Sequence, residues 1–211
     1  MPPHITKPAD GWRLAGALTA AILLIAALIA IAAPGSEGVR AAIRFSARTS
    51  MVLFLLTFTA TALHHLWPGD ITRSIRRNRR PLGISFAGSH AVHALAISAY
   101  IALDPVSFHE AVPPIGLALN GLGYAFIIAM TATSFDRTAA LIGPTAWRWL
   151  HTAGAYFIWF DFAKSIFPRA IHSPFYSVFA AALVLALGLR LFASFQSRKP
   201  GVPTMTSPAA V

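Results

Sequence analysis

Hydrophobic residues are gathered into six long stretches, and short polar segments separate each stretch from the next. Each has about 20 residues, enough for an α-helix rising 1.5 Å per residue to cross a bilayer core of about 30 Å. Lipid offers no hydrogen-bond partner to backbone N–H and C=O groups, so each crossing has to be a helix. The sequence therefore predicts an all-α fold, a polytopic membrane protein built as a six-helix transmembrane bundle. The stretches cover residues 14–33, 49–67, 82–103, 115–135, 145–164 and 175–195.

Proline and glycine mark the ends of these stretches, and proline is tolerated at a helix start because the first N–H groups have no partner there. We expect residues 1–11 and 197–211 to be disordered tails and residues 12–196 to form one transmembrane domain. The first stretch has a basic start, as a signal peptide has. It is longer than the usual apolar core of about 7–15 residues, so we interpret it as a retained anchor. The breaks are Pro34-Gly35, Pro68-Gly69, Asp104-Pro105, Pro113-Pro114, Gly143-Pro144 and Pro174.

The composition agrees with a membrane protein and excludes several other classes. Hydrophobic residues make up 56% of the 211 residues and charged residues 11%, whereas soluble domains have about 25% charged residues. The absence of Cys excludes disulfide scaffolds, iron–sulfur clusters and thiolate metal sites. The chain also has no Gly-x-Gly-x-x-Gly motif after a strand and no long polar segment to bind flavin or nicotinamide. A redox function therefore needs a partner or a quinol as the electron donor.

The basic residues predict the orientation of the chain in the membrane. The net charge is +10, from 17 Lys and Arg against 7 Asp and Glu. Lys and Arg gather on the cytoplasmic side, and a cytoplasmic N-terminus places twelve of the 17 inside and five outside. We expect an integral protein of a bacterial inner or plasma membrane with both termini on the cytoplasmic side. The basic residues are expected to face the lipid bilayer and not to bind nucleic acid. The orientation is least consistent with the loop of residues 34–48, which it places outside although the loop contains Arg40, Arg44 and Arg48. We expect this loop to lie on the outer membrane surface as an amphipathic segment.

Three histidines inside the stretches are the main functional candidates, because ionisable groups within a membrane are costly and rare. His90 and His93 lie in the third stretch and His151 in the fifth. Counted from the cytoplasmic ends of their stretches, His90 is about 12 Å, His93 about 16 Å and His151 about 9 Å deep. Imidazoles at similar depth on facing helices are typical axial ligands of haem. The sequence thus predicts a b-type haem held by His151 and by His93 or His90; the alternative is that these side chains only hydrogen-bond between helices.

Charged residues supply further candidates. Arg79 and Arg80 directly precede the third stretch and can bind a haem propionate bidentately. The other arginines of residues 73–80 serve orientation and attraction to anionic lipid. Asp161 and Lys164 are three residues apart in the fifth stretch and predict an intramembrane ion pair; the alternative is a role in moving a proton or a substrate.

Short motifs spread over residues 47–192 together resemble one family. They are Ala47-Arg48-Thr49, Arg79-Arg80-Pro81-Leu82-Gly83, Phe86-Ala87, His93, Thr131-Ala132-Thr133-Ser134, Trp147-Arg148-Trp149-Leu150-His151 and Ser173-Pro174. This set resembles the ferric reductase-like transmembrane domain family. Within it, the set is most similar to the haem-binding membrane subunit of the periplasmic methionine-sulfoxide reductase system.

The resemblance implies b-type haem between the third and fifth helices, with His93 and His151 as iron ligands and Arg79 and Arg80 as the loop arginines. It implies electron passage from a cytoplasmic or quinol donor to an acceptor or partner reductase across the membrane. The family has a second fifth-helix His thirteen residues after the first, where this chain has Lys164, a poor haem ligand. We therefore expect an oxidoreductase electron-transfer subunit with one haem rather than two, and quinone as a further candidate cofactor. The alternative is a non-haem small transporter or scaffold subunit that keeps the fold.

Overall fold

The computed structural model describes residues 8–198, with side chains described for residues 11–196. Helices account for nearly all of this part of the chain, which confirms the all-α prediction. Residues 8–11 and 197–198 were expected in the tails but belong to the first and the last helix. Residues 1–7 and 199–211 of the expected tails lie outside the described residues. The helices are α1 (Pro8–Ala32), α2 (Ser36–Leu66), α3 (Asp70–Arg77), α4 (Arg79–Leu103), α5 (Pro105–Ala111), α6 (Pro114–Ala132), α7 (Asp136–His172) and α8 (Pro174–Arg198).

The helices end where proline and glycine predict. Gly35 between α1 and α2 has a φ of 62°, in the left-handed region that glycine adopts without a Cβ clash. Asp104 caps α5, because its carboxylate accepts a hydrogen bond of 3.1 Å from the backbone N–H of Ser107. Gly143, with φ 75° and ψ 166°, divides α7 into a short segment before it and a long segment that starts at Pro144. Each predicted break is confirmed.

The helix α2 is longer than predicted. Residues 36–48, expected as a separate surface segment, form its first turns. Its arginines find partners there: Arg40 Nη1 lies 3.7 Å from Glu37 Oε1, and the Arg48 guanidinium lies 4.6 Å from the centre of the Phe175 ring. Since these contacts accommodate the charges, the helix continues through this segment without a break.

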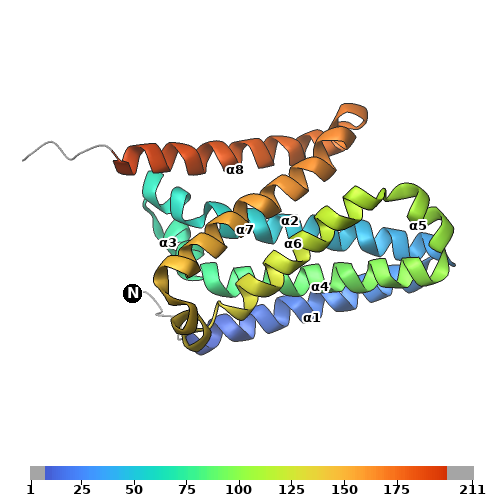
Figure 1. Ribbon diagram of the computed structural model, residues 1–211, viewed down its shortest axis with the longest axis horizontal. Helices are drawn as coiled ribbons and strands as arrows, with labels where there is room; N and C mark the ends of the chain where they lie inside the picture. The colour runs from blue at the N-terminus through green and yellow to red at the C-terminus, as the bar shows by residue number, and fades with distance from the viewer. Residues whose placement is uncertain (1–7, 199–211) are drawn as a thin grey trace, which may run out of the picture.

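Five helices are long and apolar enough to cross a membrane, which supports an integral membrane protein. The sixth predicted crossing, in α7, is not among them, because polar residues such as His151, Asp161 and Lys164 lower its mean hydropathy; the count of six is therefore not confirmed. Nevertheless, α7 packs against α6 and α8 (Figure 1). The start of α1 and the end of α8 lie at the same end of the molecule. The candidate spans are Gly11–Ala32, Ser36–Leu66, Arg79–Leu103, Pro114–Ala132 and Pro174–Gln196.

Small side chains hold α1, α2 and α4 together. Between α2 and α4 the contact is polar, since Ser50 Oγ lies 2.8 Å from Ser89 Oγ. Small residues of this kind allow membrane helices to approach closely and to hydrogen-bond across the interface. Four serines of these two helices have no exposed surface: Ser46, Ser50, Ser85 and Ser89.

Gly88 allows α1 to approach α4. A Cβ at this position would overlap Thr19 Oγ1 and lie 3.1 Å from Thr19 Cβ. We expect Gly88→Leu to lower the free energy of unfolding by about 1–3 kcal/mol, because overpacking forces the helices apart. Thermal unfolding in detergent measures this loss. The matched control is Gly121→Leu on α6, where no atom lies within 4 Å of the added Cβ; equal melting temperatures for the two variants would contradict the close packing.

Candidate functional site

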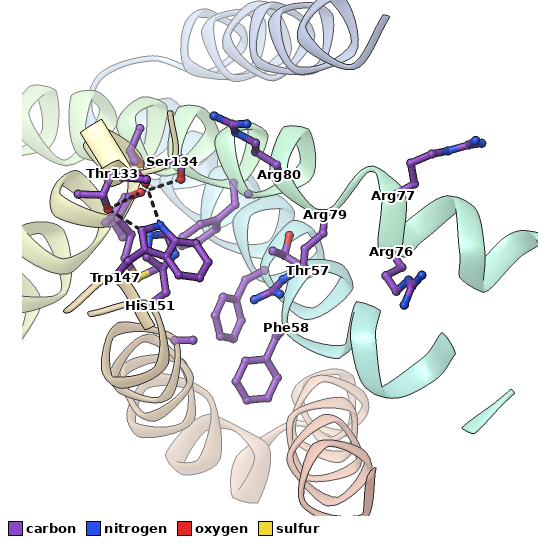
Figure 2. Close-up of a pocket in the computed structure, with 18 of the residues that line it drawn as sticks. Thr57, Phe58, Arg76, Arg77, Arg79, Arg80, Thr133, Ser134, Trp147 and His151 are labelled. Carbon is purple, nitrogen blue, oxygen red and sulfur yellow. Dashed lines mark hydrogen bonds between the residues drawn. The ribbon is translucent and has the colours of Figure 1, made fainter. Parts of the chain in front are cut away.

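A cavity of about 360 Å³ lies among α2, α3, α4, α6, α7 and α8 (Figure 2). Its lining includes the residues around the junction of α3 and α4, which Figure 1 places at one end of the molecule. Its volume is within the range of small-molecule sites, about 300–1,000 Å³. One part of its wall is apolar, and the other carries an imidazole and several guanidinium groups. The cavity therefore suits an amphiphilic ligand with a hydrophobic body and acidic groups. The apolar wall includes Phe54, Phe58, Phe86, Ile127 and Met130.

His151 is the histidine that lines this cavity. Its ring stacks on Trp147, with ring centres 4.2 Å apart, and its Nε2 lies 3.1 Å from Thr133 Oγ1. The Thr133 hydroxyl donates its one proton to a carbonyl of α6, 2.8 Å away at Ala129, so His151 donates from Nε2 to Thr133. The indole of Trp147 donates to the Thr133 carbonyl at 2.9 Å. These contacts, drawn in Figure 2, fix the imidazole between the end of α6 and α7.

Arg79 and Arg80 both line the cavity but differ in their partners. Arg80 Nη1 lies 3.0 Å from Asp136 Oδ1, so its charge is neutralised within the protein. Arg79 takes part in no ion pair within the described part of the chain. Figure 2 shows its side chain directed toward Phe58, whereas that of Arg77, which also lines the cavity, points away from His151. Arg79 is therefore the better placed of the two predicted arginines to bind an acidic group.

Arg190 of α8 also lines the cavity, and it was not among the predicted site residues. Its Nη1 donates to the Phe58 carbonyl at 3.3 Å. Its guanidinium lies 4.4 Å from the centre of the Phe58 ring and 5.0 Å from that of Tyr156. The signal in the sequence is a lone charged residue inside the sixth apolar stretch, because such a residue is tolerated where it faces the interior of a bundle.

His90 and His93 on α4 form a separate group, and neither lines the cavity. His93 Nδ1 lies 3.1 Å from Ser46 Oγ, whose proton is directed to a backbone carbonyl of α2, so the imidazole keeps its lone pair on Nε2. The ring of His90 packs against Tyr124 and Phe162, with ring centres 5.0 and 6.1 Å away. Its Nδ1 is buried without a hydrogen-bond partner in the described structure.

His90 and His151 lie at different levels along the molecule. Tyr124 of α6 is beside His90, and Thr133, which follows the last residue of α6, is beside His151. The separation is nine residues, or about 13 Å. On α7, Phe162 is beside His90 and comes eleven residues after His151, about 16 Å. The comparable depths expected from the sequence are not found. Residue counts within each stretch do not measure a common depth, because α7 is inclined to α4 (Figure 1).

The cavity thus brings together His151, Arg79 and Arg80 of the predicted site and leaves His90 and His93 outside it. Its donor set fits a b-type haem with one protein imidazole, because the phenylalanines suit the macrocycle and the guanidiniums suit its carboxylates. Iron bound at His151 Nε2 would replace the hydrogen bond to Thr133. Within residues 11–196, no three His, Asp or Glu side chains gather to hold a bare metal ion. A porphyrin, which brings four ring nitrogens of its own, needs no such group.

Comparison with known proteins adds no assignment: no protein-family model, curated protein or solved structure matches the chain. The family resemblance therefore remains a hypothesis based on short motifs, and the function has to be argued from the cavity itself.

Proposed function

We propose that the chain is a transmembrane electron-transfer subunit that holds one b-type haem in the cavity beside His151. The observation that carries this proposal is the convergence, in one cavity, of a single imidazole, aromatic walls and five guanidinium groups, of which only that of Arg80 has an acid partner in the described structure. These contacts match the three parts of haem, which are its iron, its flat apolar ring and its two propionates.

Each part of the cavity has a role in this proposal. His151 binds the iron, and the stacked indole of Trp147 keeps its ring in orientation. The rings of Phe54, Phe58 and Phe86 cover the macrocycle and exclude water. When bound, haem accepts and releases one electron as its iron alternates between the ferric and ferrous states. The identity of the ligand and the apolar walls are the features of the chain that tune the redox potential.

The arginines beside the cavity support a cytoplasmic position for this end of the molecule. Arg76, Arg77, Arg79 and Arg80 all line it, and basic residues gather on the cytoplasmic side of membrane proteins. In a bacterial inner or plasma membrane, electrons then enter from a cytoplasmic or quinol donor and pass to an acceptor or partner reductase across the membrane. Both termini face the cytoplasm in this arrangement. His93 or His90, expected from the sequence as the second ligand of the same iron, does not line the cavity.

The optical spectrum of the purified protein tests this proposal. Protein from haem-replete cells is expected to show a Soret band that shifts on reduction with dithionite. A pyridine haemochromogen assay is expected to give one haem per chain, because this cavity is lined by one histidine. A preparation without absorbance above the protein band would contradict the proposal.

A non-haem transporter is the second candidate function, and one ion pair favours it. Lys164 Nζ lies 2.8 Å from Asp161 Oδ1 and 2.9 Å from Asn120 Oδ1, between α6 and α7. Charged pairs inside helical membrane proteins often mark ion or proton pathways. Substrate flux into proteoliposomes that is abolished by Asp161→Asn, together with a spectrum free of haem, would support this candidate.

A further inference from the structure

Four arginines that line the cavity take part in no ion pair of the described residues, and two of them, Arg79 and Arg190, lie beside its aromatic wall. Arg79 and Arg190 line the same cavity, and like charges that face one apolar space repel each other. An anion bound between them removes this repulsion. The ion pairs of the described residues involve other side chains: Arg40 with Glu37, Arg73 with Asp70, Arg80 with Asp136 and Lys164 with Asp161.

Arg190 is held in place before any ligand arrives. The rings of Phe58 and Tyr156 flank its guanidinium, and one N–H group donates to the Phe58 carbonyl. Of the five N–H donors of the guanidinium, these contacts use one in a hydrogen bond within the protein. The remaining donors are available to a ligand, and little side-chain entropy is left to lose on binding.

Arg79 reaches the cavity from a different helix. It is the first residue of α4, and Figure 2 shows its side chain extending toward Phe58 and Thr57. Because α4 and α8 are far apart in the sequence, Arg79 and Arg190 reach the cavity from independent elements. Both cations lie beside the aromatic wall, so a bound molecule can place an acid group at each guanidinium and its apolar body against the phenylalanines.

We propose that Arg79 and Arg190 form a carboxylate clamp, which selects the ligand of this cavity as an apolar molecule carrying carboxylate groups. Guanidinium binds carboxylate through two parallel hydrogen bonds, which gives both affinity and geometry. The inference rests on the proposed function, since the carboxylates of haem are its propionates. It goes beyond that function by naming Arg190 of α8 and Arg79 as the residues that select a ligand with carboxylate groups.

Titration of the full-length, haem-free protein with two porphyrins tests the clamp. The probes are iron protoporphyrin IX and its dimethyl ester, which has the same ring and iron but no free acid. We expect the wild type to bind the acid at least about tenfold more tightly than the ester. Arg190→Gln and Arg79→Gln are each expected to reduce this preference about tenfold and to leave ester affinity unchanged. Arg137→Gln removes the same charge from an exposed side chain that does not line the cavity and is expected to keep the preference.

Equal affinity of the wild type for the acid and the ester would overturn the clamp while leaving haem binding intact. If neither porphyrin binds, the proposed haem function fails and the clamp is tested with oleate and methyl oleate. A preference for oleate that is lost in Arg190→Gln then supports the clamp, and equal binding overturns it. Arg190→Lys keeps the positive charge but removes the guanidinium that forms two parallel hydrogen bonds to a carboxylate. With a wild-type melting temperature and an intermediate acid preference, this variant separates loss of the clamp from loss of the fold.

Discussion

His151→Ala is expected to remove haem from the purified protein, with loss of the Soret band and of every spectral change on reduction. The reason is that His151 is the imidazole that lines the cavity, and alanine leaves no group there to bind iron. Aromatic contacts and arginines alone hold the porphyrin weakly. Removing a residue that merely orients a metal ligand already costs about 10–100-fold in affinity, so the haem content should fall by at least about tenfold. Absorbance at the Soret maximum per mole of protein measures the loss.

His93→Ala is the matched control for this variant. It removes an imidazole of the same size from α4, at a position outside the cavity, so haem content is expected to stay at the wild-type level. Haem retained by His151→Ala would contradict the site proposed here. Loss of haem from both variants would indicate instead that the two histidines share one iron, as the sequence predicts, and that α4 and α7 come closer when haem is bound.

The helix ends were predictable because the signals that produce them are local. Gly143-Pro144 divides α7 since the glycine adopts a positive φ and the following proline starts a new helical segment. Asp104-Pro105 ends α4 and starts α5, because the Asp104 carboxylate caps α5 and Pro105 is its first residue. Long apolar runs between such breaks have few alternatives to helix in lipid. Composition and turn chemistry together therefore determine most of the secondary structure.

The relative levels of side chains on different helices were not predictable from the sequence. His90 and His151 each lie inside an apolar stretch, but the inclination of α7 brings Phe162, and not His151, beside His90. The entry of Arg190 into the cavity likewise depends on how α8 packs against α2 and α7. The sequence shows only that this arginine must face the protein interior. Tilt and packing arise from the whole set of helix contacts, which no single segment encodes.

Lys164→Met is expected to lower the free energy of unfolding by about 2–3 kcal/mol, which corresponds to a fall in Tm of about 4–12 °C. Methionine fills a similar volume but leaves the carboxylate of Asp161 without its cation. The side chains of Lys164 and Asp161 are 30% and 26% exposed, so the loss is smaller than for a fully buried pair. Thermal unfolding in detergent measures the effect. Haem content is expected to stay unchanged, because neither residue lines the cavity.

The double variant Asp161→Asn/Lys164→Met distinguishes the two partners of this lysine. If the cost of the single variant comes from the unpaired carboxylate, neutralising that group restores most of the stability, and the two changes are strongly non-additive. Additive losses would instead assign the stabilising contact to Asn120, whose Oδ1 accepts a hydrogen bond of 2.9 Å from Lys164 Nζ. Additive and non-additive losses of stability thus distinguish which partner of Lys164 stabilises the packing of α7 on α6. Lys164 and His151 are thirteen residues, or about 20 Å, apart along α7. Loss of haem from Lys164→Met would therefore contradict a haem site confined to the cavity beside His151.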